Sequence, residues 1–276
     1  MKQTFEQYLE QLIANNTLKY YMISFEKYKL RISNIEKAKY KDILDYIHRY
    51  KANHIALAVI KHYYNYLVEN GIRDDHPCRR LYLKTKRSEV QHQDLFTVEE
   101  LERLLERENR YKYLKQRNKV ILSLLIYQGL TPENIIRLKV NEVNFDAGTI
   151  YIKATNKLHR RTLELKAKQM HILYRYIHEC KVYIKGVYLF YTMRGEKLTI
   201  DTLQNIVEVM QPLFPDRELT LTKIRQSVIS NWLNNDNISM EDVQLLAGHK
   251  WLSTTEKYQQ QNHEQKRKLI NRYFPL

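Results

Sequence analysis

The most informative stretch of this sequence is Leu246-Ala-Gly248-His249-Lys-Trp-Leu-Ser-Thr-Thr-Glu-Lys-Tyr258. It places a histidine and a tyrosine nine residues apart near the end of a strongly basic chain. Gly248 closes an apolar run, and the cluster Ser253–Thr255 predicts the start of a short helix before Tyr258. A phenol with a pKa near ~10 is almost un-ionised at neutral pH, so it becomes a nucleophile only where its surroundings assist it. Because the chain holds 22 tyrosines, the spacing and not the residue type singles out Tyr258.

Arg225 lies 24 residues before His249, in Leu221-Thr-Lys-Ile-Arg225-Gln-Ser227. Arg225, His249 and Tyr258 at these spacings resemble the C-terminal signature of the tyrosine recombinases, the phage integrase type. Members of that family cut and rejoin DNA through a covalent 3′-phosphotyrosine. The resemblance implies that Tyr258 attacks the phosphodiester while Arg225 and His249 stabilise the transition state. A guanidinium suits that role because its rigid fork of donors keeps its charge as negative charge develops on the phosphate.

The resemblance also implies a lysine at the turn between the second and third strands of a small sheet, as general acid for the leaving 5′ oxygen. Counting back from Thr162-Leu-Glu-Leu165, Lys157 falls within one residue of that place. Lys153 lies four residues earlier, on the strand. We therefore expect Lys157 to be the catalytic lysine, although a turn lysine in so basic a chain is ordinarily a solvated charge.

The sequence departs from the family pattern at the first catalytic arginine. Where the family reads Gly-Leu-Arg, this chain reads Gly129-Leu-Thr131. Thr131 followed by Pro132 is a good N-cap and first residue for a helix, so this is a stability motif that needs no catalytic explanation. Arg137 lies six residues downstream and could substitute only if the helix aimed it at the site. Loss of one such donor typically costs ~10²–10³ in rate.

A second departure precedes Arg225. The family's histidine three residues before this arginine is replaced by Thr222, and Lys223 lies one position out of register. A shift of one residue turns a helical side chain by about 100°, so Lys223 is a poor replacement.

Residue periodicity predicts a mainly α protein with a small antiparallel sheet. Only six glycines and five prolines occur among 276 residues, and most of the chain shows helical periodicity. The exceptions alternate apolar and polar residues, which is typical of half-buried strands. They are Val143 to Phe145, Thr149 to Lys153 and Arg161 to Leu165.

The expected organisation is the two-domain tyrosine recombinase architecture. Residues 1–78 form a helical core-binding (SAM-like) DNA-binding domain, and residues 79–95 form a basic linker. Residues 96–276 form the catalytic domain, an α-rich domain with a three-stranded sheet and a C-terminal tail. Thr97-Val-Glu-Glu100 predicts a capping box at the start of that domain. The tail, with Leu269 and Ile270, is expected to dock on a neighbouring protomer or to pack on its own domain.

Composition indicates a polyanionic partner. Lys and Arg number 46 against 31 Asp and Glu, a net charge of +15, which favours double-stranded DNA and salt-sensitive binding. No apolar stretch is long enough to cross a membrane, and the N-terminus lacks a signal-peptide pattern, so we expect a cytoplasmic protein. The resemblance implies no cofactor, neither metal nor ATP, and a homo-tetramer on paired DNA sites. It also implies, as a further partner, an accessory directionality protein.

Three interpretations follow from the sequence. The first is a site-specific recombinase or integrase of a mobile genetic element, acting through Tyr258, Arg225, His249 and Lys157. The second is a catalytically weakened relative that binds DNA as an accessory or regulatory protein, which the missing first arginine favours. The third, an unrelated helical nucleic-acid-binding protein, would leave the spacing between His249 and Tyr258 to chance.

Overall fold

The computed structural model describes residues 3–51, 54–83, 92–106, 111–235 and 237–259. The chain divides into two compact units, Met1–Ser88 and Glu89–Leu276. The division falls inside the segment 79–95, which is predicted from the sequence to be a basic linker. Residues 84–91 of that segment, and the C-terminal tail from residue 260 onward, lie outside the described residues.

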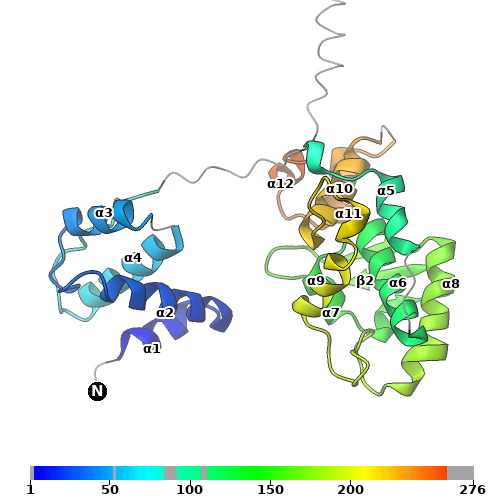
Figure 1. Cartoon of the computed structure of the whole chain (residues 1–276), viewed down its shortest axis with the longest axis horizontal. Coiled ribbons are helices and arrows are strands. Elements are labelled where there is room, and N and C mark those ends of the chain that lie inside the picture. Colours follow the sequence, from blue (N-terminus) through cyan, green and yellow to red (C-terminus); the bar gives the residue numbers. More distant parts are fainter. Residues whose placement is uncertain (1–2, 52–53, 84–91, 107–110, 236, 260–276) are drawn as a thin grey trace, which may run out of the picture. The chain divides into compact units, whose positions relative to one another are not determined.

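The first unit is helical (Figure 1). Its helices are α1 (Phe5–Leu12), α2 (Asn15–Lys29), α3 (Tyr40–Arg49) and α4 (His54–Glu69). Helix α4 packs along α2, and the hydroxyls of Tyr28 and Tyr64 meet in the core at 2.7 Å. Helices α1, α3 and α4 follow the apolar faces visible in the sequence. Helix α2 spreads its apolar residues more evenly around its axis, so periodicity alone does not single it out.

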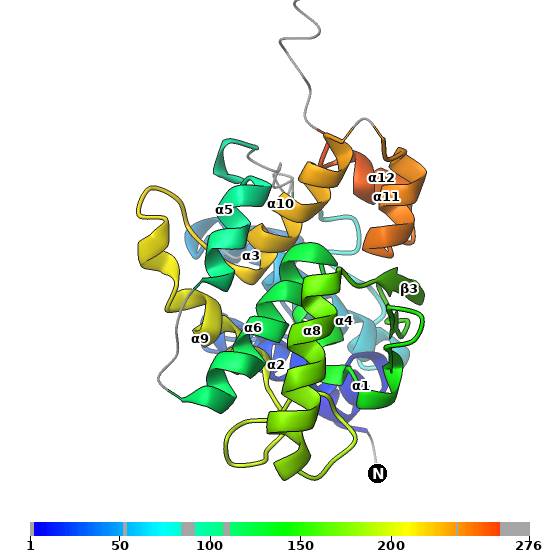
Figure 2. The same cartoon turned by 90° about the vertical axis from the view of Figure 1, so that its right-hand side faces the viewer.

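The second unit is built around a buried helix. Figure 2 shows α6 beside α8, and the two are in contact. Ile121, Leu124 and Leu125 of α6 are almost wholly buried, so α6 is the core helix of this unit. The capping box at Thr97 is present, with the Thr97 hydroxyl accepting from the Glu100 amide. The helices of this unit are α5 (Val98–Glu102), α6 (Lys112–Tyr127), α7 (Pro132–Arg137), α8 (Ala167–Arg175), α9 (Ile200–Glu208), α10 (Leu221–Leu233), α11 (Met240–Ala247) and α12 (Leu252–Glu256).

A three-stranded antiparallel sheet interrupts these helices, in the order β1-β2-β3. Its strands are β1 (Val143–Asn144), β2 (Thr149–Ile152) and β3 (Arg161–Glu164). In β3 the residues alternate between buried and exposed, beginning with a buried Arg161 opposite Ile152. The sheet is held to the core helix where the Gln128 side-chain amide donates to the Glu164 carbonyl at 2.8 Å. The mainly α fold with one small antiparallel sheet is therefore confirmed.

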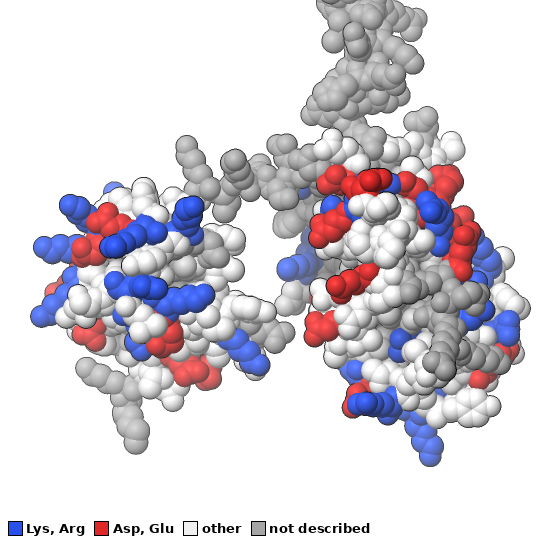
Figure 3. All heavy atoms as spheres, viewed as in Figure 1, with Lys and Arg blue, Asp and Glu red and all other residues white. Residues whose placement is uncertain are grey.

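On the face drawn in Figure 3, both units carry Lys and Arg side chains together with Asp and Glu. Basic side chains predominate over the first unit, whereas acidic side chains gather in the upper part of the second. Among the described residues, no helix combines the length and apolarity needed to span a bilayer.

Candidate active site

The site begins where α11 ends at Gly248. This residue has φ +73° and ψ +22°, the left-handed conformation that lets glycine terminate a helix. The chain turns there, and the His249 amide donates back to the Gln244 carbonyl at 3.0 Å. The Gln244 side chain in turn donates to the His249 carbonyl at 3.2 Å. The glycine thus fixes the backbone that carries His249.

Helix α12 places Tyr258 over His249. The prediction that Ser253–Thr255 start this helix was wrong, because Trp251 is the N-cap and the cluster lies inside α12. The buried Thr255 hydroxyl instead pairs with His249 Nδ1 at 2.9 Å and so orients the imidazole. The Tyr258 amide donates to the Thr255 carbonyl at 3.0 Å, and its ring stacks on His249 with centroids 5.9 Å apart and planes 20° apart.

Arg225 enters the site from α10. Its Nη1 donates to the Gly129 carbonyl and its Nη2 to the Ala247 carbonyl, the latter at 2.7 Å. One guanidinium therefore joins the turn after α6 to the end of α11. Burial lowers the pKa of Arg225 to about 10, with Tyr258 acting in the opposite direction, so the group remains cationic at neutral pH.

The turn between β2 and β3 is hydrogen-bonded to the end of α11, at Gly248 and His249. The His159 amide donates to the Gly248 carbonyl at 2.8 Å, and Leu158 forms an antiparallel bridge with His249. Lys157 lies exposed on this turn, next to the bridged residue. Lys153 is instead engaged on the strand, with its ammonium 3.0 Å from the carboxylate of the buried Glu142. The structure thus brings the turn of Lys157 to the neighbourhood of His249 and ties Lys153 elsewhere.

Arg161, the first residue of β3, is the residue that the sequence reasoning missed. Its side chain is 9% exposed and lies against Gly248, where an added Cβ would stand 2.4 Å from Nη1. Burial, and then the charge of Arg225, lower the pKa of Arg161 to about 10. A signal for it exists in the sequence, since alternation from Leu163 and Leu165 puts Arg161 on the inward face of the strand.

The cluster is electropositive. Burial, then Arg225 and then Arg161 lower the pKa of His249 to about 4, so its imidazole is neutral at pH 7. Burial raises the pKa of Tyr258 against the opposing influence of Arg225, which keeps the phenol protonated. The buried guanidinium of Arg161 and the partly buried one of Arg225, beside a neutral imidazole and a phenol, form a site suited to an anion.

The departures from the family pattern have structural explanations. Thr131 is the N-cap of α7, with its hydroxyl accepting from the Asn134 amide at 3.2 Å, as predicted. Arg137 is 60% exposed and pairs with Glu133 at 3.0 Å, away from the buried cluster. Thr222 is exposed.

The neighbour of Thr222 is also engaged elsewhere. The Lys223 ammonium lies 3.4 Å from Asp94 and 3.5 Å from Glu218. Lys223 is therefore held by two carboxylates and does not take the place of the absent histidine.

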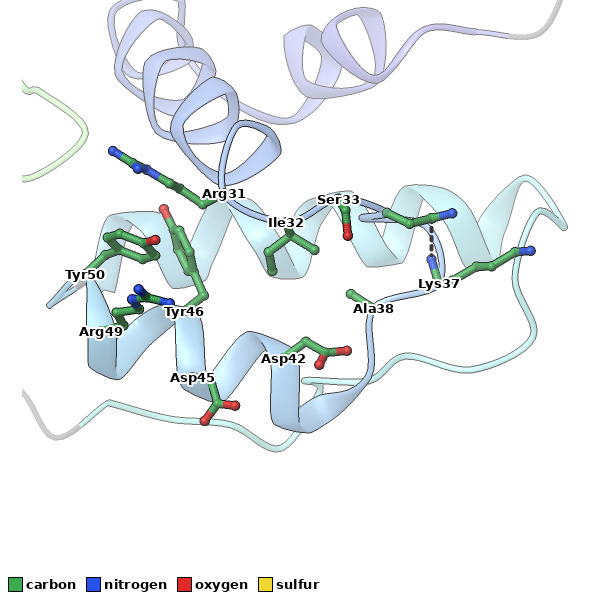
Figure 4. A pocket seen from close by; sticks show the side chains of 11 residues that line it. Arg31, Ile32, Ser33, Lys37, Ala38, Asp42, Asp45, Tyr46, Arg49 and Tyr50 are labelled. Atoms are coloured by element: carbon green, nitrogen blue, oxygen red, sulfur yellow. Dashed lines mark hydrogen bonds between the residues drawn. The ribbon is translucent and has the colours of Figure 1, made fainter.

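Each of the two units has a pocket lined by charged side chains. One of about 240 Å³ lies against the cluster, with Arg161, Gly248 and His249 in its wall. Another, of about 420 Å³, lies in the first unit between the loop that follows α2 and helix α3 (Figure 4). Asp42 and Asp45 line it together with Arg31 and Arg49, so it presents charges of both signs.

The chain is similar to known proteins over most of its length. The model of the phage integrase family matches residues 94–265, more than half of the chain. The tyrosine recombinase XerD of Staphylococcus saprophyticus is 24% identical, over 97% of this chain and 95% of that protein. The XerD of Staphylococcus haemolyticus is 27% identical, over 70% of this chain and 66% of its own.

Solved structures share the fold. The XerH site-specific recombinase bound to a palindromic difH substrate matches with a TM-score of 0.72 and 19% identity, covering 94% of this chain and 78% of that one. The Tn1549 transposon integrase in complex with circular intermediate DNA matches with a TM-score of 0.71 and 15% identity, covering 97% and 99% of the two chains.

Proposed function

The chain belongs to the phage integrase family, and from this premise we propose that it is a site-specific DNA recombinase that cuts and rejoins double-stranded DNA. Its relatives carry the name tyrosine recombinase, and its structural neighbours were solved with DNA substrates. Tyr258 is the nucleophile of the proposed reaction, and its product is a 3′-phosphotyrosine.

The cleavage step follows from the arrangement of the side chains. The Tyr258 oxygen forms a bond to the scissile phosphorus as the bond from phosphorus to the 5′ oxygen breaks. The phenol proton passes to solvent as Tyr258 attacks, and the neutral imidazole of His249, oriented by Thr255 through Nδ1, stabilises the charge that develops on the phosphate in the transition state. Arg225 holds the non-bridging oxygens, and Lys157 on the adjacent turn gives its proton to the leaving 5′ oxygen.

Rejoining reverses these transfers. The 5′ hydroxyl of a partner strand attacks the phosphotyrosine, and Tyr258 leaves as the phenol. The energy of the broken phosphodiester is kept in the tyrosine ester, so the proposed reaction uses no metal, ATP or other cofactor.

The observation that carries the proposal is the stacking of Tyr258 on a His249 that Thr255 orients, beside the partly buried Arg225 and the buried Arg161. A protein that only binds DNA has no need to bury a cation beside a phenol and an imidazole, because such burial costs solvation. For this reason the accessory DNA-binding interpretation is the weaker one.

Recombination of a plasmid tests the function. Two copies of the DNA flanking the gene are placed in one plasmid, and the wild type is compared with Tyr258→Phe in the presence of EDTA. We expect deletion or inversion products with the wild type alone. Products that require added metal or ATP would contradict the proposed chemistry.

The assembly is a further part of the proposal. We infer that the protein acts as a homo-tetramer on paired DNA sites, with an accessory protein setting the direction of the reaction. Joining two duplexes requires a nucleophile for each of four strands, which supports four protomers. Light scattering of the protein with and without duplex DNA measures this stoichiometry.

A further inference from the structure

The proposed recombinase lacks a guanidinium where its resemblance to the family requires one. Thr131 occupies that position and is committed to capping α7, with its hydroxyl also donating to the Asn134 side chain at 2.9 Å. Arg137 points to solvent and pairs with Glu133. Of the arginines expected from the family pattern, this leaves Arg225 to face the scissile phosphate. Two of its donors already bind backbone carbonyls.

Arg161 brings a second guanidinium to the same place from a different element. It sits on the inward face of β3, on the strand that follows the turn of Lys157. Its guanidinium contacts Gly248, the residue between the Ala247 carbonyl that Arg225 binds and the catalytic candidate His249. The charge of Arg161 also acts on His249. Arg161, Arg225 and His249 therefore form one cluster.

The hydrogen bonds of Arg161 are incomplete. Its Nη1 makes one long contact, 3.4 Å, to the His159 carbonyl. Its Nε and Nη2 are buried and have no hydrogen-bond partner within the described part of the chain. Among the described residues, no carboxylate is ion-paired with Arg161 or with Arg225. A buried arginine that served only packing would normally be satisfied by a carboxylate or by carbonyls.

Unsatisfied donors on a buried cation are costly, and a bound anion removes that cost. The fork formed by Nε and Nη2 matches two oxygens of a phosphate. We propose that Arg161 replaces the missing first arginine and, together with Arg225, holds the non-bridging oxygens of the scissile phosphate, donating to them through Nε and Nη2. This inference rests on the proposed function, and it assigns to that function a catalytic residue from β3 in place of one from the start of α7.

The first test measures an anion site directly. Inorganic phosphate is titrated at constant ionic strength against the wild type, Arg161→Met and Arg160→Met, and the Tm of each protein is recorded. Arg160 is the matched control because it is the exposed neighbour of Arg161. We expect phosphate to raise the Tm of the wild type and of Arg160→Met, with little rise in Arg161→Met. Equal rises in all three proteins would overturn the inference.

The same variants separate a catalytic role from a structural one. Without phosphate, Arg161→Met is expected to raise the Tm by about 2 °C or more, because an unpaired buried charge is replaced by an apolar side chain of similar length. A structural arginine would give a fall in Tm. A lower Tm together with an unchanged phosphate response would contradict the proposal.

The second test follows the chemistry. A library of nicked duplexes with randomised sequence is incubated with each protein, and denaturant-resistant adducts are timed. We expect Arg161→Met to form adducts ~10²–10³ more slowly than Arg160→Met. Methylguanidinium should restore part of the rate to Arg161→Ala, whereas methylammonium at equal ionic strength should not.

The outcomes distinguish the two levels of the proposal. Adducts that depend on Tyr258 but form at the same rate in both methionine variants would overturn the role of Arg161 and leave the recombinase intact. Absence of adducts with the wild type would count against the recombinase itself. In that case the phosphate titration still decides whether Arg161 holds an anion.

Discussion

Replacing Gly248 by alanine should reduce DNA cleavage far more than it reduces stability. The added Cβ would lie 2.4 Å from Nη1, 2.9 Å from Cζ and 3.2 Å from Cδ of Arg161. The closest of these atoms is at the free end of a flexible side chain, so Arg161 can move aside at low cost. The remaining cost is that of holding a residue with a Cβ in the left-handed backbone conformation, which lowers the free energy of unfolding by roughly 1–2 kcal/mol. In a unit of this size, each kcal/mol of lost stability lowers the Tm by about 2–4 °C.

Gly71→Ala is the control for the backbone cost. Gly71 has a similar φ of +63°, and an added Cβ there meets nothing within 4 Å. Both alanine variants should therefore lose a similar free energy of unfolding. Only Gly248→Ala should lose ~10²–10³ in the rate of covalent adduct formation, because its displaced guanidinium no longer faces the phosphate.

A double-mutant cycle identifies the cause of that loss. If the effect of Gly248→Ala passes through Arg161, the substitution should cost little further rate in the Arg161→Met background. Fully additive losses would show that alanine acts through another residue, such as His249. A rate for Gly248→Ala within about threefold of the wild type would contradict this prediction, because the overlap with Arg161 would then have no functional consequence.

Three further predictions concern other parts of the site. Folding lowers the pKa of His249 from 6.5 to about 4, so the unfolded state binds more protons than the folded state between these two pH values. The free energy of unfolding should therefore decrease as the pH falls from 6.5 to about 4. Thermal melts over this range should show a smaller decrease for His249→Gln than for the wild type. Lys157→Ala should slow adduct formation by a factor of ~10²–10⁴. Lys153→Ala should lower the Tm, because it removes the partner of Glu142, with little change in the rate of adduct formation. Equal rates in the two variants would contradict the assignment of Lys157 as general acid. Thr131→Ala should cost about 1 kcal/mol of stability through the lost cap and leave the adduct rate nearly unchanged, as denaturant unfolding and gel assays can check.

The elements of this fold were predictable where local chemistry decides them. The alternation from Thr149 to Lys153 identified a strand, and Thr97 with Glu100 identified the start of a helix, because each signal lies within a few residues of the structure it causes. Thr131 was predictable as a cap for the same reason. The start of α12 was predicted wrongly, since Thr255 forms its hydrogen bond with His249 and not with the end of its own helix.

The candidate site was predictable only in part, because it depends on contacts between distant segments. The spacing of Arg225, His249 and Tyr258 was visible in the sequence, and their catalytic roles remain predictions. Arg161 lies 64 residues before Arg225 and carries no motif, so its position beside Gly248 follows only from the sheet packing against the end of α11. An arginine at an inward position of an amphipathic strand was the one available signal.

The most direct test of the central claim is to locate the covalent bond. Wild-type protein and Tyr258→Phe are incubated with nicked duplex DNA, the adduct is digested with protease and nuclease, and the modified peptide is sequenced by mass spectrometry. We expect a 3′-phosphate ester on Tyr258 in the wild type and no adduct in Tyr258→Phe. An adduct that persists in Tyr258→Phe, or a phosphate ester on another residue, would contradict it.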